Sequence, residues 1–193
     1  ILIIPVMYLF AKKLLKNTYL ATATTALLVF DCMHFTLSRI ATIDIFAAFF
    51  ILLMYYYLYQ YFTADQAYRK SRNALTDSFP PSSVYTPLAL CGINMAFGIA
   101  TKWTGVYAGL GLGILFVWYT LMNFPKKQWT RLLGFCCVFF IAIPLIVYTL
   151  CFIPVVGYTP YKNLLDKVIS GTQYMFHYHS TLVAEHYYSS PFY

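Results

Sequence analysis

A short segment, residues 30–44, gathers four ionisable side chains in a chain that is otherwise strongly apolar. It reads FDCMHFTLSRIATID and contains two aspartates, one histidine and one arginine. A charged side chain at the centre of a membrane helix costs roughly 3 kcal/mol on insertion scales, so such residues are expected to face a protein interior or a wet cavity. There they pair with one another or bind a ligand. This segment is therefore the first candidate for a functional site.

Two interpretations of the segment follow from its spacing. On one continuous helix, His34 and Ser38 would lie within about 60° of Asp31, and Arg39 would lie about 80° round. Asp31 and Arg39 then form a structural ion pair between helices, or Arg39 offers a planar fork to a phosphate at the outer membrane surface. Asp44, just past the turn, either orients Arg39 or caps the next helix.

Another cation, Lys102, lies at the end of an apolar run beside Trp103. Snorkelling of the lysine and interface anchoring by the tryptophan explain this pair without any function. The alternative is that Lys102 makes a second phosphate contact on the same face as Arg39.

A further polar cluster, HYHSTLVAEHYYSSPFY, closes the chain from residue 177 to residue 193. His177 and His179 flank one tyrosine, so on a helix they point about 160° apart and are poorly placed to chelate one ion. A zinc site with Glu185 and His186 is disfavoured for this reason, and we expect no metal. We interpret the cluster as a substrate-facing loop whose candidate residues are His179, Glu185, His186, Ser189 and Ser190.

The composition is that of a polytopic membrane protein. Of the 193 residues, 61% are hydrophobic and only 10% are charged, whereas a soluble domain carries about a quarter charged residues. The aromatic share of 20% suits interfacial belts and packing. The five cysteines lie in apolar runs without a CxxC pairing, which favours small buried hydrophobes over disulfides or metal ligands.

Apolar runs that approach the roughly 20 residues needed to cross a bilayer predict an all-α membrane helix bundle over residues 1–153. Because the chain begins inside such a run and ends in a polar segment, we interpret it as an internal piece of a longer protein. Pro144 is expected to kink the last span. The predicted spans are about 1–11 (partial), 18–38, 43–62, 84–101, 104–124 and 131–153, with a polar loop at 63–83.

The basic residues predict the orientation of these helices. Nine of the thirteen lysines and arginines fall in the first, third and fifth loops, which share one side because successive loops alternate. The positive-inside rule makes that side cytoplasmic. The Ser38–Asp44 turn, the Lys102–Trp103 turn and the segment 154–193 then lie outside, so both polar clusters reach one extracytoplasmic face. The net charge of +7 follows from this topology and would attract anionic lipid. It is poor evidence for a nucleic-acid partner, and we expect none.

The segment 154–193 is predicted to be an extracytoplasmic loop that carries an amphipathic helix over about 160–183. Thr159 and Pro160 supply a capping hydroxyl and a proline at the first helical position. Apolar residues then recur at helical spacing, with polar residues between them. Such a helix is expected to lie in the membrane interface.

Three ordered segments resemble the protein O-mannosyltransferase family, especially its bacterial members. They are FDCMHFTLSRIATID, GIATKWTGVYAGLGL and YMFHYHSTLVAEHYYSSPFY. The resemblance implies a GT-C membrane glycosyltransferase that moves mannose, with inversion, from a polyprenyl-phosphate-mannose donor to Ser or Thr hydroxyls of an acceptor protein. It implies no cofactor.

The family's motifs map onto particular residues here. Its SR…D arginine matches Arg39 and its KW lysine matches Lys102, which implies that both bind the donor phosphate, with Asp31, His34 and Asp44 in support. The family's catalytic Asp-Glu pair lies in the first extracytoplasmic loop, which we expect before Ile1, so no catalytic residue is assigned. The last motif departs from the family, because Tyr187 follows His186 where a proline is common.

Two alternatives stay open at this point. One is a GT-C enzyme that transfers another sugar, such as aminoarabinose, to a lipid. The other is a transporter in which Asp31, His34 and Arg39 relay protons or bind substrate. Transporters tend to show repeats and helices broken at the midplane, whereas polarity here gathers at one membrane face, which favours the enzyme. The resemblance favours a bacterial plasma membrane with the site outside, or the endoplasmic reticulum in a eukaryote. The oligomeric state is not predicted.

Overall fold

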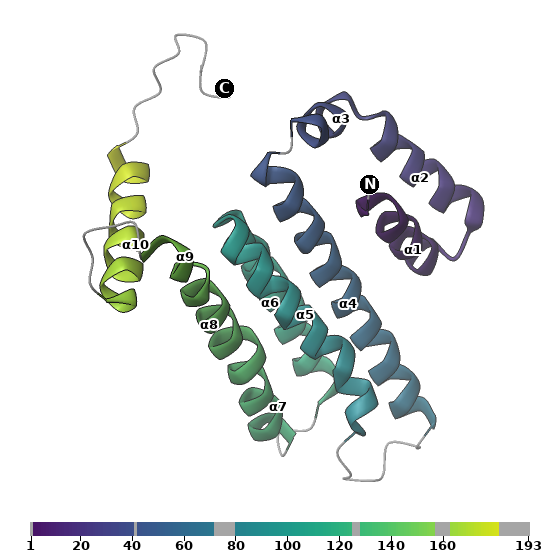
Figure 1. Ribbon diagram of the computed structural model, residues 1–193. Helices are drawn as coiled ribbons and strands as arrows, with labels where there is room; N and C mark the ends of the chain where they lie inside the picture. Colours follow the sequence, from purple (N-terminus) through teal and green to yellow (C-terminus); the bar gives the residue numbers. More distant parts are fainter. Residues whose placement is uncertain (1, 41, 72–79, 125–127, 157–162, 182–193) are drawn as a thin grey trace. The chain divides into compact units, whose positions relative to one another are not determined.

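The computed structural model describes residues 2–40, 42–71, 80–124, 128–156 and 163–181, and its regular secondary structure in these ranges is entirely helical. The predicted all-α class is confirmed. The chain divides into a unit of residues 1–148 and a unit of residues 149–193, each described by itself. The elements, shown in Figure 1, are α1 (Ile3–Leu15), α2 (Thr18–Phe30), α3 (Cys32–Arg39), α4 (Ile43–Ser71), α5 (Ser82–Thr101), α6 (Thr104–Asn123), α7 (Trp129–Cys136), the π-helical segment η2 (Cys137–Ala142), α8 (Ile143–Leu150), α9 (Ile153–Val156) and α10 (Leu164–Thr181).

Four stretches within the described ranges are long and apolar enough to cross a bilayer: α4, α5, α6 and the continuous stretch Trp129–Leu150. The pair α2–α3 makes a fifth only if it counts as one span, and it is bent by 57°. The structure therefore confirms a polytopic membrane bundle. The predicted span over 18–38 is not one continuous helix, because the chain breaks at Asp31 between α2 and α3.

Helix α4 extends well past the predicted end of its span. It continues through Ser71, so residues 63–71, predicted as part of a polar loop, are helical. One reason is local: Asp65 and Arg69 are four residues apart, and their side chains form an ion pair on the helix. The extension carries α4 beyond the apolar run that the sequence marks and, as shown below, brings Asp65 into the protein interior.

The core of the first unit lies between α4, α5, α6 and α7. Helix α4 packs most extensively on α5, and the two run side by side in Figure 1. Glycine permits two close approaches: a Cβ at Gly105 would lie 2.7 Å from the Gly98 carbonyl carbon, and one at Gly92 would lie 2.5 Å from the Phe139 oxygen. Fully buried side chains of this core include Met54, Leu58, Tyr61, Leu88 and Cys91.

The last span is irregular directly before Pro144. A proline has no N–H to donate, so it interrupts the hydrogen-bond ladder of the preceding turn. In the structure the helix widens there into η2, which ends two residues before the proline. Such π-helical segments inside α-helices are frequently found at functional sites.

The second unit contains α9 and α10. A Cβ at Gly171 of α10 would lie 3.2 Å from Cε1 of Phe152, so the glycine lets the helix approach that ring. Leu165, Ile169 and Phe176 stay exposed on α10. The predicted start at Thr159–Pro160 lies outside the described residues, and placement of α10 in the membrane interface stays a prediction.

Candidate functional site

Asp31 is the cap of α3 rather than a member of one long helix. Its backbone is extended, with φ −67° and ψ 114°. Its carboxylate accepts hydrogen bonds from the backbone N–H groups of Met33, at 3.3 Å, and His34, at 3.0 Å. An aspartate in this position satisfies amides that a helix start otherwise leaves without partners. The angular relation predicted for one continuous helix is therefore wrong, and the role of Asp31 in the structure is local.

Arg39 ends α3 and is exposed. Its guanidinium carbon lies 5.6 Å from the centroid of the Phe35 ring, one helical turn earlier. Within the described ranges no carboxylate lies within ion-pair distance of Arg39, so the predicted structural pair with Asp31 does not form there. The half-buried His34 contributes its backbone N–H to the Asp31 cap. The arginine thus presents a positive charge with no acid bound to it among the residues described.

Lys102 forms an ion pair with Asp44. The lysine is the C-cap of α5, the aspartate lies in the first turn of α4, and the Lys102 ammonium donates to Oδ1 of Asp44. The two side chains are 45% and 48% exposed. A carboxylate at a helix N-terminus and a cation at a helix C-terminus are each favoured by the helix dipole. Asp44 therefore holds Lys102, a role that differs from both roles considered for it from the sequence.

The predicted phosphate-binding residues meet at one end of α4. Arg39 closes α3, which leads directly into the N-terminal end of α4 (Figure 1). Lys102 reaches the same end of α4 through Asp44. The next residue, Trp103, caps α6, and the N–H of Gly105 donates to the Lys102 carbonyl at 2.9 Å, which closes the predicted Lys102–Trp103 turn. The structure thus brings Lys102 to Asp44, while Arg39 lies five residues before Asp44 in the chain, at the end of the short helix α3 that Asp31 caps.

The C-terminal candidates are not part of this arrangement. Only the backbone of His179, in α10, is described, and Glu185, His186, Ser189 and Ser190 lie outside the described residues. Among the residues that the structure describes, no three His, Cys, Asp or Glu side chains gather as a metal site would require.

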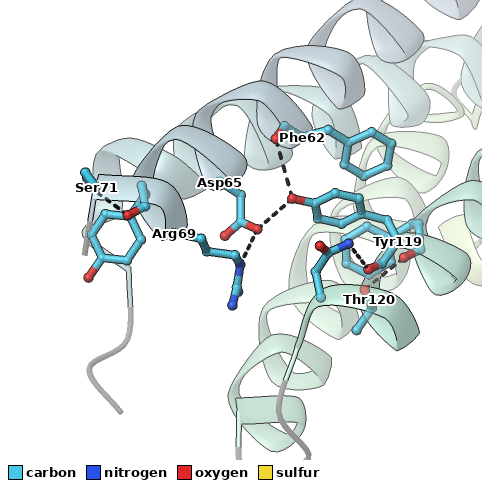
Figure 2. A network of polar contacts seen from close by, with 9 residues as sticks. Phe62, Asp65, Arg69, Ser71, Tyr119 and Thr120 are labelled. Carbon is cyan, nitrogen blue, oxygen red and sulfur yellow. Dashed lines mark hydrogen bonds and ion pairs between the residues drawn. The ribbon is translucent and has the colours of Figure 1, made fainter. Parts of the chain in front are cut away.

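A second acidic site, which the sequence analysis missed, lies at the other end of α4. Asp65 has a side chain with 0% exposure, and its Oδ2 accepts from Nε of Arg69 at 2.6 Å and from the Tyr119 hydroxyl at 2.8 Å. Figure 2 shows the carboxylate between these two donors. The Arg69 guanidinium also lies 3.9 Å from the centroid of the Phe124 ring. The cluster links α4 to α6 through a buried charge.

One sequence signal could have drawn attention to this cluster. Asp65 and Arg69 have the i, i+4 spacing of a helical ion pair, directly after a predicted span. It was overlooked because residues 63–83 were predicted as a loop. The contact of Tyr119 with Asp65 crosses 54 residues of sequence, and no local pattern indicates it.

The comparisons with known proteins bear on the class of this site. The sequence matches the family of dolichyl-phosphate-mannose-protein mannosyltransferases over residues 1–156. The chain belongs to this family. No curated protein and no solved structure matched it.

The protein therefore belongs to a family of glycosyltransferases. Its candidate spans make it an integral membrane protein. The matched range contains both ends of α4, with Arg39, Asp44, Lys102 and Asp65, and excludes α10. A glycosyl phosphate gains negative charge on its phosphate as the sugar departs, and fixed cations stabilise that charge. At the N-terminal end of α4, Lys102 is paired with Asp44, and the exposed Arg39 ends the preceding helix α3.

Proposed function

We propose that this protein transfers mannose from a polyprenyl-phosphate-mannose donor to Ser or Thr hydroxyls of proteins at the extracytoplasmic face of the membrane. The observation that carries the proposal is the presence of two exposed cations, Arg39 and Lys102, at one end of α4. The family supplies the class of reaction. The resulting enzyme is a GT-C glycosyltransferase whose phosphate site needs no metal.

In the proposed reaction the acceptor hydroxyl oxygen attacks the anomeric carbon of mannose from the side opposite the phosphate. The bond from that carbon to the phosphate oxygen breaks, and its electron pair stays on the phosphate. A general base removes the hydroxyl proton. Arg39 offers its fork of N–H donors to the phosphate, and Lys102 adds a point charge.

None of the three aspartates discussed above is proposed as the base. Asp31 is bonded to backbone amides, Asp44 is paired with Lys102, and Asp65 is buried at the opposite end of α4. Each carboxylate therefore has another role.

Replacing Asp44 by a phosphate as the anion bound to Lys102 costs little free energy. An ion pair between solvent-exposed groups contributes about 0–1 kcal/mol, and both members of the Asp44–Lys102 pair are about half exposed. The donor phosphodiester, which carries one negative charge, can share the lysine with the aspartate at small cost, and the second charge that the phosphate gains when the sugar departs strengthens its contact with Lys102. Asp44 then keeps the ammonium in place while the donor is absent.

The experiment that tests the function is a transfer assay on the full-length protein in lipid nanodiscs. The donors are polyprenyl-phosphate-mannose and polyprenyl-phosphate-aminoarabinose, and the acceptors are a Ser/Thr-rich peptide and a lipid. We expect mannosylated peptide, detected by mass spectrometry. Aminoarabinose transferred to lipid instead would support the alternative GT-C reaction, and the absence of any transfer would contradict the proposed function.

The proposed membrane face is tested by thiol labelling. In a background without native cysteines, Gln173→Cys, on the exposed surface of α10, should react with an impermeant maleimide applied from outside. Lys70→Cys, exposed at the far end of α4, is the matched control and should react only after permeabilisation. Labelling in the reverse pattern would place the site on the cytoplasmic face.

A further inference from the structure

The buried end of α4 contains polar atoms that no described protein group satisfies. Asp65 binds Arg69 and Tyr119 through one carboxylate oxygen, Oδ2. Its other oxygen, Oδ1, is buried and accepts no hydrogen bond from the residues that the structure describes. In Figure 2 this second oxygen points away from Tyr119. A buried carboxylate oxygen without a donor carries a large desolvation cost, so it calls for a partner that is not a protein side chain.

Two neighbours of Asp65 on the same face of α4 are unsatisfied in the same way. The Tyr61 hydroxyl, one turn earlier, is fully buried and makes no hydrogen bond within the described ranges. Nη2 of Arg69, one turn later, is also buried and has no acceptor there. Residues four apart on a helix project to the same side, with Cβ atoms about 5–6 Å apart. The three groups therefore border one interior region, at spacings that a molecule one atom across can bridge.

A fourth such atom comes from the start of α7. Gln128 is the N-cap residue of α7, and its Oε1 is buried without a donor in the described part of the chain. Phe124 links this residue to the cluster. The Arg69 guanidinium lies 3.9 Å from the centroid of the Phe124 ring, and the Phe124 carbonyl accepts from Nε1 of Trp129 at 3.3 Å. Gln128, directly before Trp129, thus supplies an acceptor from the α7 side.

The charges of these groups select the class of ligand. The Arg69 guanidinium disfavours a metal ion or another cation, and the Asp65 carboxylate disfavours an anion. Two of the four atoms only accept hydrogen bonds, one only donates, and the tyrosine hydroxyl can do both. A small neutral molecule that both donates and accepts is the complement of this set. Water meets the requirement, and buried waters make about three hydrogen bonds to groups of this kind.

We propose that ordered water occupies this interior site, where it bridges Asp65 to Arg69, to the Tyr61 hydroxyl and to the Gln128 amide. The water accepts from Nη2 of Arg69 and donates to Oδ1 of Asp65. A buried ion pair offsets its desolvation only when its remaining lone pairs and protons are also hydrogen-bonded, and the water supplies these bonds. It stabilises the ion pair and joins α4 to the start of α7. The site is separate from the proposed phosphate site and does not depend on the proposed function.

The first test detects the water in the full-length protein in lipid nanodiscs. Brief X-ray irradiation converts water into hydroxyl radicals, which oxidise the side chains that touch it. Tyr61 should be oxidised although it is fully buried, whereas Met54, about two turns earlier on α4 and equally buried, should not be. Methionine reacts faster than tyrosine with hydroxyl radicals, so oxidation of Tyr61 alone identifies local water. Absence of oxidation at Tyr61, or oxidation of both residues above the unirradiated background, would overturn the proposal.

The second test uses the sign of a stability change. Removing a buried hydroxyl that has no partner should raise the melting temperature, whereas removing one that binds water should lower it. Tyr61→Phe should therefore lower the melting temperature by roughly 2–4 °C, the shift expected for the loss of one hydrogen bond in a protein of this size. The control is Tyr19→Phe on α2, where the side chain is 87% exposed, and it should cause no shift. An unchanged or raised melting temperature of Tyr61→Phe would show that the site is dry.

Gln128→Leu tests the bridge to α7. The variant removes the acceptor and keeps a side chain of similar size, so it should lower the melting temperature and reduce the yield of oxidised Tyr61 on irradiation. Gln173→Leu, at an exposed position of α10, is the matched control and should change neither value. If Gln128→Leu also changes neither, the water does not reach α7 and the proposed bridge is wrong.

Discussion

Helix α4 carries an aspartate paired with a cation near each of its ends, and the two pairs have opposite surroundings. Asp44 and Lys102 are about half exposed. Asp65 has 0% exposure and Arg69 is 25% exposed. An exposed pair contributes about 0–1 kcal/mol to stability, whereas loss of one partner of a buried pair costs about 3–5 kcal/mol. The exposed Asp44–Lys102 pair is therefore suited to exchanging its aspartate for a ligand, whereas the buried Asp65–Arg69 pair is suited to stabilising the fold.

The neighbours of each pair support this division. At the buried end, Tyr119 donates to Asp65, and the rings of Phe62 and Tyr119 stack with centroids 4.2 Å apart. This holds α4 to α6. At the exposed end, the ion pair joins α4 to the turn between α5 and α6, beside the end of α3. A bound anion can therefore compete with Asp44 at the exposed end, whereas at the buried end it would have to disrupt the core.

The largest expected effect is on stability at the buried end. Asp65→Ala should lower the free energy of unfolding by about 3 kcal/mol, because Arg69 loses its acid in a largely buried place. Asp44→Ala, the matched change at the other end, should cost at most about 1 kcal/mol. Both are measured by denaturant unfolding of the purified protein in detergent. Equal losses in the two variants would remove the distinction between the pairs.

Arg39→Ala should reduce turnover of the full-length enzyme by about a hundredfold or more, the range for loss of one contact to charge in a transition state. Arg39→Lys should retain less turnover than its unchanged charge would suggest, because lysine cannot donate two parallel hydrogen bonds to the phosphate. The control is Lys12→Ala. Lys12 is also exposed, and its ammonium lies over the ring of Tyr8, four residues earlier, as Arg39 lies over Phe35. A stable Arg39→Ala enzyme with near-normal turnover would exclude the phosphate role.

Substitutions in the Asp44–Lys102 pair distinguish a role in phosphate binding from a purely structural role. Lys102→Ala should lower turnover by at least about tenfold, short of the loss at Arg39, because a lysine supplies charge without a fork. In the double variant Asp44→Lys with Lys102→Asp, the ion pair can re-form, so thermal stability should return to the normal value. Turnover should stay low because the cation now projects from α4. Recovery of both properties would mean that the pair is purely structural.

The smallest effect is expected for Tyr119→Phe. The change removes one hydrogen bond to Asp65 but leaves its ion pair with Arg69, so the free energy of unfolding should fall by about 1–2 kcal/mol. Turnover with a saturating donor should stay within about twofold, because Tyr119 contacts the opposite end of α4 from Asp44 and Lys102 and the two places share no partner. A large loss of turnover at normal stability would link the buried end to catalysis.

Much of the fold could be predicted from the sequence because apolar runs indicate spans locally. The predicted 84–101 and 104–124 correspond to α5 and α6, and the predicted turn at Lys102 separates them. The break at Asp31 was missed because an aspartate inside an apolar run can cap a new helix as well as continue an old one. The extension of α4 to Ser71 was missed because polar residues were taken to mark a loop.

The sequence by itself determined that this is an α-helical membrane protein, because apolar length and low charge leave helices as the way to satisfy backbone groups in lipid. It also indicated Arg39 and Lys102 as cations at the ends of apolar runs. Only the tertiary structure decided which acid meets which cation. Asp44 and Lys102 are 58 residues apart, and Asp65 and Tyr119 are 54 apart, so helix packing rather than local pattern makes one aspartate exposed and the other buried.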